Sequence, residues 1–328
     1  MTELYIGSHL STAGGWNALL ERSHEEGGTA FAFFPRSPYG KRSKALDPAG
    51  AAAFGARLKA EGYGPLVVHA PYVYNLAGKD EAKRAFAIEA LAEDIELLTA
   101  IREAGQEVYI NIHPGAHVGQ GTETGCRLIS EGLNQVFERT TGVMVLLETM
   151  AGKGTECGRN FDELATIMDG VENKANVGVT FDTCHVLDAG YDLENDYDGV
   201  MRQLDEVIGL ARVKAIHVND SQFGLGSHKG PSRQHRRRAA RHPVLHATGQ
   251  RSDHGQAPDD SRNQGADADH APRRNRAAAW AGGLNHIGSS APPPAATAPT
   301  GPPTNGDIVV MRTSYTTIPQ YDFIVMTL

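Results

Sequence analysis

Histidine and carboxylate side chains close six short apolar runs in the first 220 residues. Imidazole nitrogens and carboxylate oxygens bind transition metals and carry protons, so these residue types can do chemistry. One such residue at the end of a run is usually only a polar start to a loop, but random placement would not put six at corresponding places. They are His9, His69, His113, Glu148, Asp182 and His217.

A bound cation would explain why these groups recur. Several carboxylates and imidazoles packed together without a metal leave unpaired or repelling groups. A mixture of histidine and carboxylate ligands suits zinc, manganese or iron. The pattern therefore predicts a metal centre where the apolar runs end.

The apolar runs alternate with amphipathic stretches such as Asp80–Glu103, Phe161–Met168 and Asp196–Leu210. This alternation predicts βα units and a parallel sheet. Seven units predict an α/β fold, a (β/α)8 TIM barrel whose eighth βα unit is missing or scrambled, with the six polar residues together at the C-terminal face. The runs are Leu4–His9, Ala30–Phe34, Leu66–His69, Val108–His113, Val143–Glu148, Val177–Asp182 and Val213–His217.

The strongest local motif is Phe181-Asp182-Thr183-Cys184-His185. Asp182 ends a strand and His185 follows three residues later, so the pair can bind one metal or two neighbouring metals. Cys184 lies between them, and we interpret it as a small buried residue that points away from the site.

Longer motifs surround these residues in a fixed order. They are Gly7-Ser8-His9-Leu10-Ser11 with Gly14-Gly15, His69-Ala70-Pro71-Tyr72 with Asn75-Leu76, His113-Pro114-Gly115 with His117, Glu148-Thr149-Met150-Ala151-Gly152-Lys153-Gly154, Ala189-Gly190-Tyr191-Asp192 after the Asp182 motif, and His217-Val218-Asn219-Asp220-Ser221. Over residues 3–229 the chain thereby resembles endonuclease IV, a family of zinc-dependent endonucleases that nick DNA at abasic sites. Thr149, Met150 and Lys153 depart from the family pattern Glu-Asn-Thr-Ala-Gly-Gln-Gly.

The resemblance implies a DNA repair enzyme with three zinc ions. It would hydrolyse the phosphodiester bond 5′ to an abasic site in double-stranded DNA, leaving a 3′-hydroxyl and a 5′-deoxyribose phosphate. Clustered zinc ions generate hydroxide near neutral pH and neutralise charge on the leaving oxygen. We expect Glu148, which would bridge two of the ions, to be the catalytic residue. The matched ligands are His69, His113 and Glu148 for one zinc, Glu148, Asp182 and His217 for a second, and His185 for the third.

Arg36, Tyr39 and Tyr72 are the residues expected to contact DNA. The loop from Pro35 to Arg42 is basic and contains Tyr39, which suits phosphate contact and stacking. In the family this loop enters the minor groove, and Tyr72 matches a residue that stacks near the lesion. A solvated surface loop and ordinary loop packing are the alternative interpretations.

The composition excludes several classes of protein. The apolar share of 40% is that of a globular protein, and no apolar run reaches the ~18–20 residues of a membrane span. The N-terminus lacks a signal-peptide pattern, and three scattered cysteines form no disulfide framework. We expect a cytoplasmic protein that binds no membrane and acts as a monomer.

The net charge of −8 hides a division at Lys229. The 99 residues that follow contain no lysine and no glutamate, but 11 arginines and 7 aspartates, a net charge of +4. The first 229 residues have a net charge of −12, and 11 of the 17 prolines lie after them. We interpret residues 1–229 as the barrel, and residues 230–328 as an aberrant tail with little order beyond a possible strand at Ile308–Arg312 or Tyr321–Thr327.

A shift of reading frame would explain the tail. The family continues after this point with an Asp-Arg-His motif, whose Asp and His complete the third zinc. Residues 230–237 can be encoded so that dropping the first base gives Asp-Arg-His-Ala-Asn-Ile-Gly. Residues 255–263, with the same offset, give Gly-Lys-Pro-Leu-Met-Thr-Leu-Glu, which matches the last strand and its zinc-binding glutamate. We therefore hypothesise a frameshift near codon 229.

Two consequences and three alternatives follow. Without an eighth strand the barrel would leave edges on the first and seventh strands, so we expect poor stability and little or no nicking activity. The alternative for the tail is a disordered, arginine-rich segment that binds nucleic acid, in which several histidines resemble a metal-binding tract. The alternative functions are a metal-dependent sugar-phosphate isomerase or epimerase, and a non-catalytic nucleic-acid-binding remnant. The tail histidines that resemble a metal-binding tract are His235, His242, His246, His254, His270 and His286.

Overall fold

The structure is a computed structural model, and it describes residues 4–39, 46–219, 221, 223–230 and 308–311. All of these lie in one compact unit, Met1–Gly249 with Thr304–Leu328. A second unit, Gln250–Pro303, lies outside the described residues, as do Lys41, Arg42 and the tail histidines.

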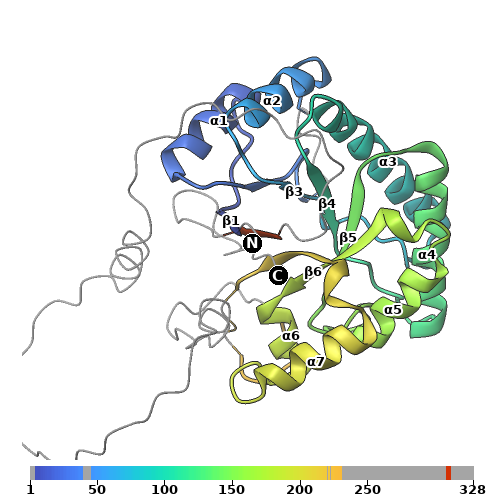
Figure 1. Ribbon diagram of the computed structural model, residues 1–328. Coiled ribbons are helices and arrows are strands. Elements are labelled where there is room, and N and C mark those ends of the chain that lie inside the picture. The colour runs from blue at the N-terminus through green and yellow to red at the C-terminus, as the bar shows by residue number, and fades with distance from the viewer. Residues whose placement is uncertain (1–3, 40–45, 220, 222, 231–307, 312–328) are drawn as a thin grey trace, which may run out of the picture. The chain divides into compact units, whose positions relative to one another are not determined.

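Eight parallel strands form one curled sheet in the order β1-β8-β7-β6-β5-β4-β3-β2 (Figure 1). The two end strands meet where a parallel bridge joins His9 to Ala32. There the Ala32 amide donates to Ser8 O at 3.0 Å, and the Leu10 amide donates to Ala32 O at 2.8 Å. The strands are β1 (Leu4–Gly7), β2 (Ala32–Phe33), β3 (Leu66–His69), β4 (Val108–Ile112), β5 (Met144–Glu148), β6 (Val177–Asp182), β7 (Val213–His217) and β8 (Ile308–Met311).

Helices lie on the outside of this sheet (Figure 1). Because the strands pack against helices on one face and against each other on the inner face, their residues are apolar and buried throughout, as in β3 and β4. The helices are α1 (Gly15–Glu26), α2 (Pro48–Ala60), α3 (Glu81–Glu103), α4 (Thr122–Arg139), α5 (Phe161–Gly170), α6 (Thr183–Ala189) and α7 (Tyr197–Val207), with short 3-10 turns η1 (Lys174–Asn176) and η2 (Leu210–Arg212).

The longest helix, α3, shows how local sequence sets an element. The Asp80 side chain caps it by accepting from the amides of Ala82 and Lys83. Leu91 and Leu98 lie on its inner face and are fully buried. Asp94 lies on the same buried side, which is unusual for a charged residue.

The TIM-barrel prediction is confirmed, including all seven expected strands. One helix end was wrong: α7 ends at Val207 rather than Leu210, because Gly209 has φ 86° and starts the separate turn η2.

The expectation of free edges on β1 and β7 is also wrong. Residues Ile308–Met311 pair in parallel with both strands, which confirms the possible strand at this place in the tail. The boundary at residue 229 stays a prediction. Among the described residues, no helix is both long enough and apolar enough to span a membrane.

Candidate metal centre

The C-terminal ends of five neighbouring strands bring the predicted ligands together. His69, Glu148 and His217 are the last residues of β3, β5 and β7. Asp182 ends β6, and His113 follows directly after β4. Because these parallel strands lie side by side in register, for example Asp182 opposite His217, their last side chains project into one space.

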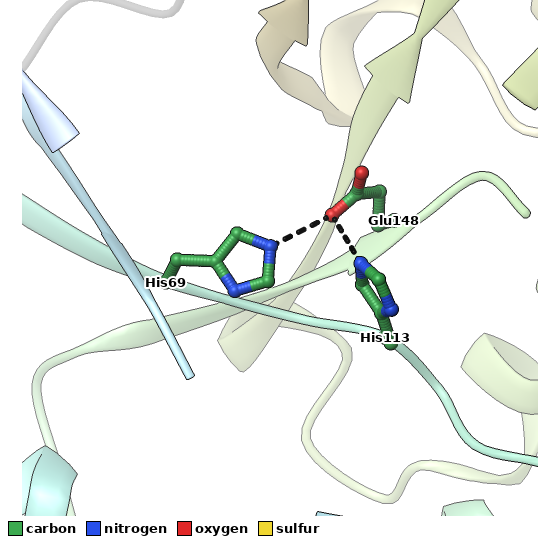
Figure 2. A group of neighbouring side chains, drawn as sticks. All are labelled: His69, His113 and Glu148. Carbon is green, nitrogen blue, oxygen red and sulfur yellow. Dashed lines mark ion pairs between the residues drawn. The ribbon is translucent and has the colours of Figure 1, made fainter. Parts of the chain in front are cut away.

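Glu148 lies at the middle of this group and is fully buried. Its Oε2 atom lies 3.3 Å from His69 Nε2 and 3.4 Å from His113 Nε2 (Figure 2). Its Oε1 atom lies 3.2 Å from His217 Nδ1 and 3.4 Å from His185 Nδ1. Each carboxylate oxygen therefore faces a different pair of histidines.

Two ligand sets result, and both contain Glu148. The first is His69, His113 and Glu148, and the second is Glu148, Asp182 and His217; in each, the ligand atoms lie within 4.8 Å of one another. Mixed imidazole and carboxylate donors at this spacing fit a divalent transition metal, and a carboxylate with one oxygen in each set can bridge two ions. The residues present fit two metal ions that share Glu148.

Main-chain carbonyls fix the orientation of two of the histidines. His69 Nδ1 lies 2.7 Å from Ala70 O, and His185 Nδ1 lies 2.9 Å from Thr149 O. A carbonyl only accepts, so Nδ1 carries the proton in both rings and Nε2 is left as the nitrogen that can bind a metal.

The electrostatics of the centre are dominated by burial and by these charges. Burial opposes ionisation of Glu148, but His217 and His113 outweigh it and lower its pKa well below the ordinary value. Burial lowers the pKa of His69 against the opposing pull of Glu148. Burial would also lower the pKa of His185, but Asp182 and Glu148 raise it to about 10, so a metal at its Nε2 would have to displace a proton. Glu148 is thus an anion, the form that binds metal.

The predicted third metal has less support from these residues. His185 lies in α6, and its backbone amide donates to Asp182 Oδ1 at 2.9 Å, so Asp182 both caps the helix and fixes this histidine. In the described part of the chain no further carboxylate or histidine completes a set around His185. Cys184 is buried, as expected, forms no disulfide and belongs to neither of the two sets.

Sequence reasoning missed two residues that hold the ligands. Asn111 Nδ2 donates to Glu148 Oε2 at 2.6 Å, and Asn219 Nδ2 donates to Asp182 Oδ2. A lone amide inside the apolar strand Val108–Ile112 was the available signal for Asn111. Buried amides of this kind orient ligating carboxylates.

His9 is one of the six polar residues expected together at the C-terminal face, although the family resemblance assigned it no ligand role. Its imidazole ring centre lies 4.5 Å from that of Phe34, with the two rings tilted by 44°, and it belongs to neither ligand set. Burial, with His69 and His217 nearby, lowers its pKa to about 3, so His9 is a neutral group that faces the centre.

The three predicted DNA contacts lie in different surroundings. The Tyr72 ring lies 5.0 Å from both His69 and His113, beside the centre. Tyr39 is exposed and its ring lies 6.3 Å from that of Tyr72. Arg36 points away to α3, where it forms an ion pair with Asp94. Contact of these residues with DNA stays a prediction.

Comparison with known proteins identifies the family of the chain. A family model described as "Xylose isomerase-like TIM barrel" matches residues 20–247. Over 229 residues the chain is 97% identical to the probable endonuclease 4 of Bifidobacterium longum (strain NCC 2705), which covers 70% of this chain and 81% of that relative. The chain belongs to the endonuclease IV family. It is also 46% identical over 227 residues to the probable endonuclease 4 of Heliobacterium modesticaldum, with 69% and 80% of the two chains covered.

A crystal structure of endonuclease IV from Thermus thermophilus is similar in fold, with a TM-score of 0.59 and 34% identity. The match covers 69% of this chain and 80% of that one. At 97% identity an alignment normally continues to the end of both chains, so its end after 229 residues, with part of the Bifidobacterium longum endonuclease 4 still unmatched, is abrupt.

Proposed function

We propose that this chain derives from a DNA repair endonuclease that hydrolyses the phosphodiester bond 5′ to abasic sites, with zinc as its metal. The observation that carries the proposal is Glu148, whose two oxygens face separate ligand sets. The 97% identity to a protein named probable endonuclease 4 supports it over a sugar-phosphate isomerase or epimerase.

The residues of the chain have distinct tasks in this proposal. His69 and His113 hold one ion with Glu148, while Asp182 and His217 hold the other. Bound zinc would supply Lewis acidity towards the phosphodiester and lower the pKa of a coordinated water.

The surrounding groups keep the centre in shape and partly closed. Asn111 holds Glu148 in place, and Ala70 O and Thr149 O keep the rings of His69 and His185 oriented. Tyr72 covers the side of the centre next to His113, which is the most exposed of the ligands in the two sets. A half-buried aromatic ring beside the metal centre suits stacking on an unpaired nucleotide.

The chain as written is proposed to have little or no nicking activity. In the family the last strand supplies a glutamate ligand, and an Asp-Arg-His motif completes a third zinc. The register places Met311 of β8 opposite His217, and Ile308–Met311 contains no carboxylate. The expected products, a 3′-hydroxyl and a 5′-deoxyribose phosphate, and a monomeric state belong to the same proposal.

One experiment tests these points together. Metal content per chain is measured by mass spectrometry, and a duplex with one abasic site is incubated with the chain, with and without EDTA. We expect about two metal ions and almost no cleavage from the 328-residue chain, but EDTA-sensitive cleavage from a chain whose frame is restored after Lys229. Robust cleavage by the chain as written would refute the impairment, and a restored chain that binds abasic DNA without cutting would favour a non-catalytic binding protein.

A further inference from the structure

Arg36 has an internal partner rather than an open position on the surface. Its Nε lies 2.7 Å from Asp94 Oδ1, and one terminal nitrogen lies 3.1 Å from Glu93 Oε2. Asp94 is only 1% exposed, whereas Glu93 is half exposed. The guanidinium therefore ends on α3 and not at the mouth of the barrel.

The same buried carboxylate holds a second segment. Tyr74 donates its hydroxyl to Asp94 Oδ2 at 2.8 Å. Arg36 belongs to residues 34–39, which follow β2, and Tyr74 belongs to residues 70–76, which follow β3. We call these the β2 segment and the β3 segment; one carboxylate attaches both of them to α3.

Further contacts connect these segments to the metal centre. The Tyr72 amide, in the β3 segment, donates to Pro38 O in the β2 segment at 3.1 Å. The Tyr72 ring then lies 5.0 Å from the rings of His69 and His113. A continuous path of contacts runs from Asp94 to the ligands of the centre.

We propose that Asp94 is a positioning residue that sets the pose of the β2 and β3 segments, and that Arg36 is the anchor of the β2 segment rather than a phosphate contact. The effect on DNA recognition rests on the proposed function, because these segments carry Tyr39 and Tyr72. The positioning itself does not depend on it.

The chemistry of the contact explains why both partners are needed. Arg36 presents a rigid fork of donors that reaches Asp94 and Glu93 together, which the single ammonium of a lysine does not reproduce. An amide in place of Asp94 would keep the shape but lose the charge that pairs with Arg36.

Hydrogen–deuterium exchange tests the positioning without DNA. The reporter is the peptide that contains the Tyr72 amide. We expect Asp94→Asn to speed its exchange about tenfold, the loss of one charge-assisted contact, while peptides in β4 to β6 stay protected. Glu96→Gln is the matched control, since it removes the same charge from an exposed position on the same helix and should change little. If Asp94→Asn exchanges like wild type, the proposal is wrong.

A milder variant distinguishes local loosening of the two segments from a general loss of folding stability. Tyr74→Phe removes only the hydroxyl that donates to Asp94 Oδ2, and leaves the ion pair with Arg36 intact. We expect faster exchange in the β3 segment and less change in the β2 segment. Equal acceleration across the whole barrel would show that Asp94 supports the fold in general and would overturn the proposal.

A pH series separates positioning from packing. Asp94 faces Arg36, Tyr74 and Glu93, and burial raises its pKa to about 6 against the pull of Arg36. The carboxylate therefore gains a proton as the pH falls through about 6, and the anchor weakens. A raised carboxyl pKa means that protonation favours the folded state as a whole, so the loosening is local. After correction for intrinsic rates, wild type should show this step and Asp94→Asn should not.

Binding of DNA in EDTA gives the functional test. The ratio of Kd for an intact duplex to Kd for a duplex with a tetrahydrofuran abasic analogue is measured by fluorescence anisotropy. We expect Asp94→Asn to lower this ratio about tenfold and Glu96→Gln, at an exposed position of α3, to preserve it. A wild-type ratio of one would refute the proposed function, while the exchange experiment would still decide the positioning.

The salt dependence of binding decides the role of Arg36. A phosphate contact contributes about 0.9 to the slope of log Kd against log salt. We expect Arg36→Gln to leave the slope unchanged and to speed exchange in the β2 segment. A slope smaller by about one, with unchanged exchange, would make Arg36 a phosphate contact and overturn the proposal.

Discussion

Strands β3 to β7, which we call the first wall of the barrel, and strand β8, which we call the second wall, differ in what they contribute to the metal centre. The first wall ends in His69, Glu148, Asp182 and His217, held by buried amides and carbonyls. The second wall pairs with both of its neighbours but ends in Met311. The first wall supplies both strand pairing and metal ligands, whereas the second wall supplies strand pairing without a ligand from the sets described.

The difference shows what each property demands of a sequence. Strand pairing uses amide and carbonyl groups that every residue except proline possesses, so a short run such as Ile-Val-Val-Met can fill a gap between two strands. A metal centre needs particular donor atoms at particular positions. A short apolar segment can therefore close a barrel without completing its site.

The chemical composition of the two regions agrees with this view. Residues 1–229 have a net charge of −12, and the remainder has +4 with neither lysine nor glutamate. The similarity to curated relatives covers 229 residues even where identity is 97%. Both observations support a shift of frame near Lys229.

Restoring the reading frame after Lys229 should have the largest effect. It would replace β8 by the segment that carries the family's glutamate and would restore the Asp-Arg-His motif. We expect cleavage of an abasic duplex to rise about a thousandfold over the present chain, since ligand-complete metal sites supply several kcal/mol of transition-state stabilisation. Gel-based single-turnover rates measure the change.

A control for this comparison is a restored chain that carries His69→Ala. It should fold like its parent and lose the gained activity. A restored chain no more active than the present one would mean that the two walls do not differ in the way described.

The next largest effect is expected for Glu148→Gln in the present chain. Glu148 belongs to both ligand sets, so one substitution should empty both: metal content should fall from about two ions per chain to less than one. Elemental analysis after gel filtration measures this. Glu138→Gln, on the exposed face of α4, is the matched control and should keep its metal. Retention of both ions by Glu148→Gln would exclude it as the shared ligand.

Much of the first wall was readable from the sequence. The strands were marked by apolar runs and their ends by His or carboxylate residues, because strand ends in a parallel barrel must meet at one face. The motif Phe181-Asp182-Thr183-Cys184-His185 placed Asp182 and His185 on either side of a strand–helix junction, and Asp182 indeed caps α6.

The features that the sequence did not reveal share a physical cause, which is contact between distant segments. The ion pair of Arg36 with Asp94 could not be predicted because Asp94 lies on a helix 58 residues further along the chain. The role of Asn111 was missed because it depends on a hydrogen bond to Glu148 in the neighbouring strand. The pairing of β8 with β1 joins opposite ends of the chain, and no local pattern reports such a contact.

A smaller effect is expected for Asn111→Ala. It removes the amide that donates to Glu148 Oε2, while both ligand sets stay complete. Removing groups that orient ligands typically weakens metal affinity by about 10- to 100-fold. Competition with a chelator of known affinity measures this, and Asn134→Ala on α4 serves as the control. Unchanged affinity would show that the first wall does not need its supporting amides.

The smallest effect is expected from breaking the second wall. Val310 pairs with Ile6 in β1 and with Ile216 in β7, so proline at this position removes a ladder donor and obstructs pairing.

Because β8 contributes pairing but no ligand, Val310→Pro should lower Tm by only about 2–4 °C, a loss of about 1 kcal/mol, and leave metal content unchanged. Val310→Thr, which keeps the amide and the β-branched shape, should match wild type. Thermal unfolding followed by circular dichroism and elemental analysis of the same samples give both quantities. If Val310→Pro also lost its metal, the second wall would support the centre after all, and closure and chemistry would not be separable in this barrel.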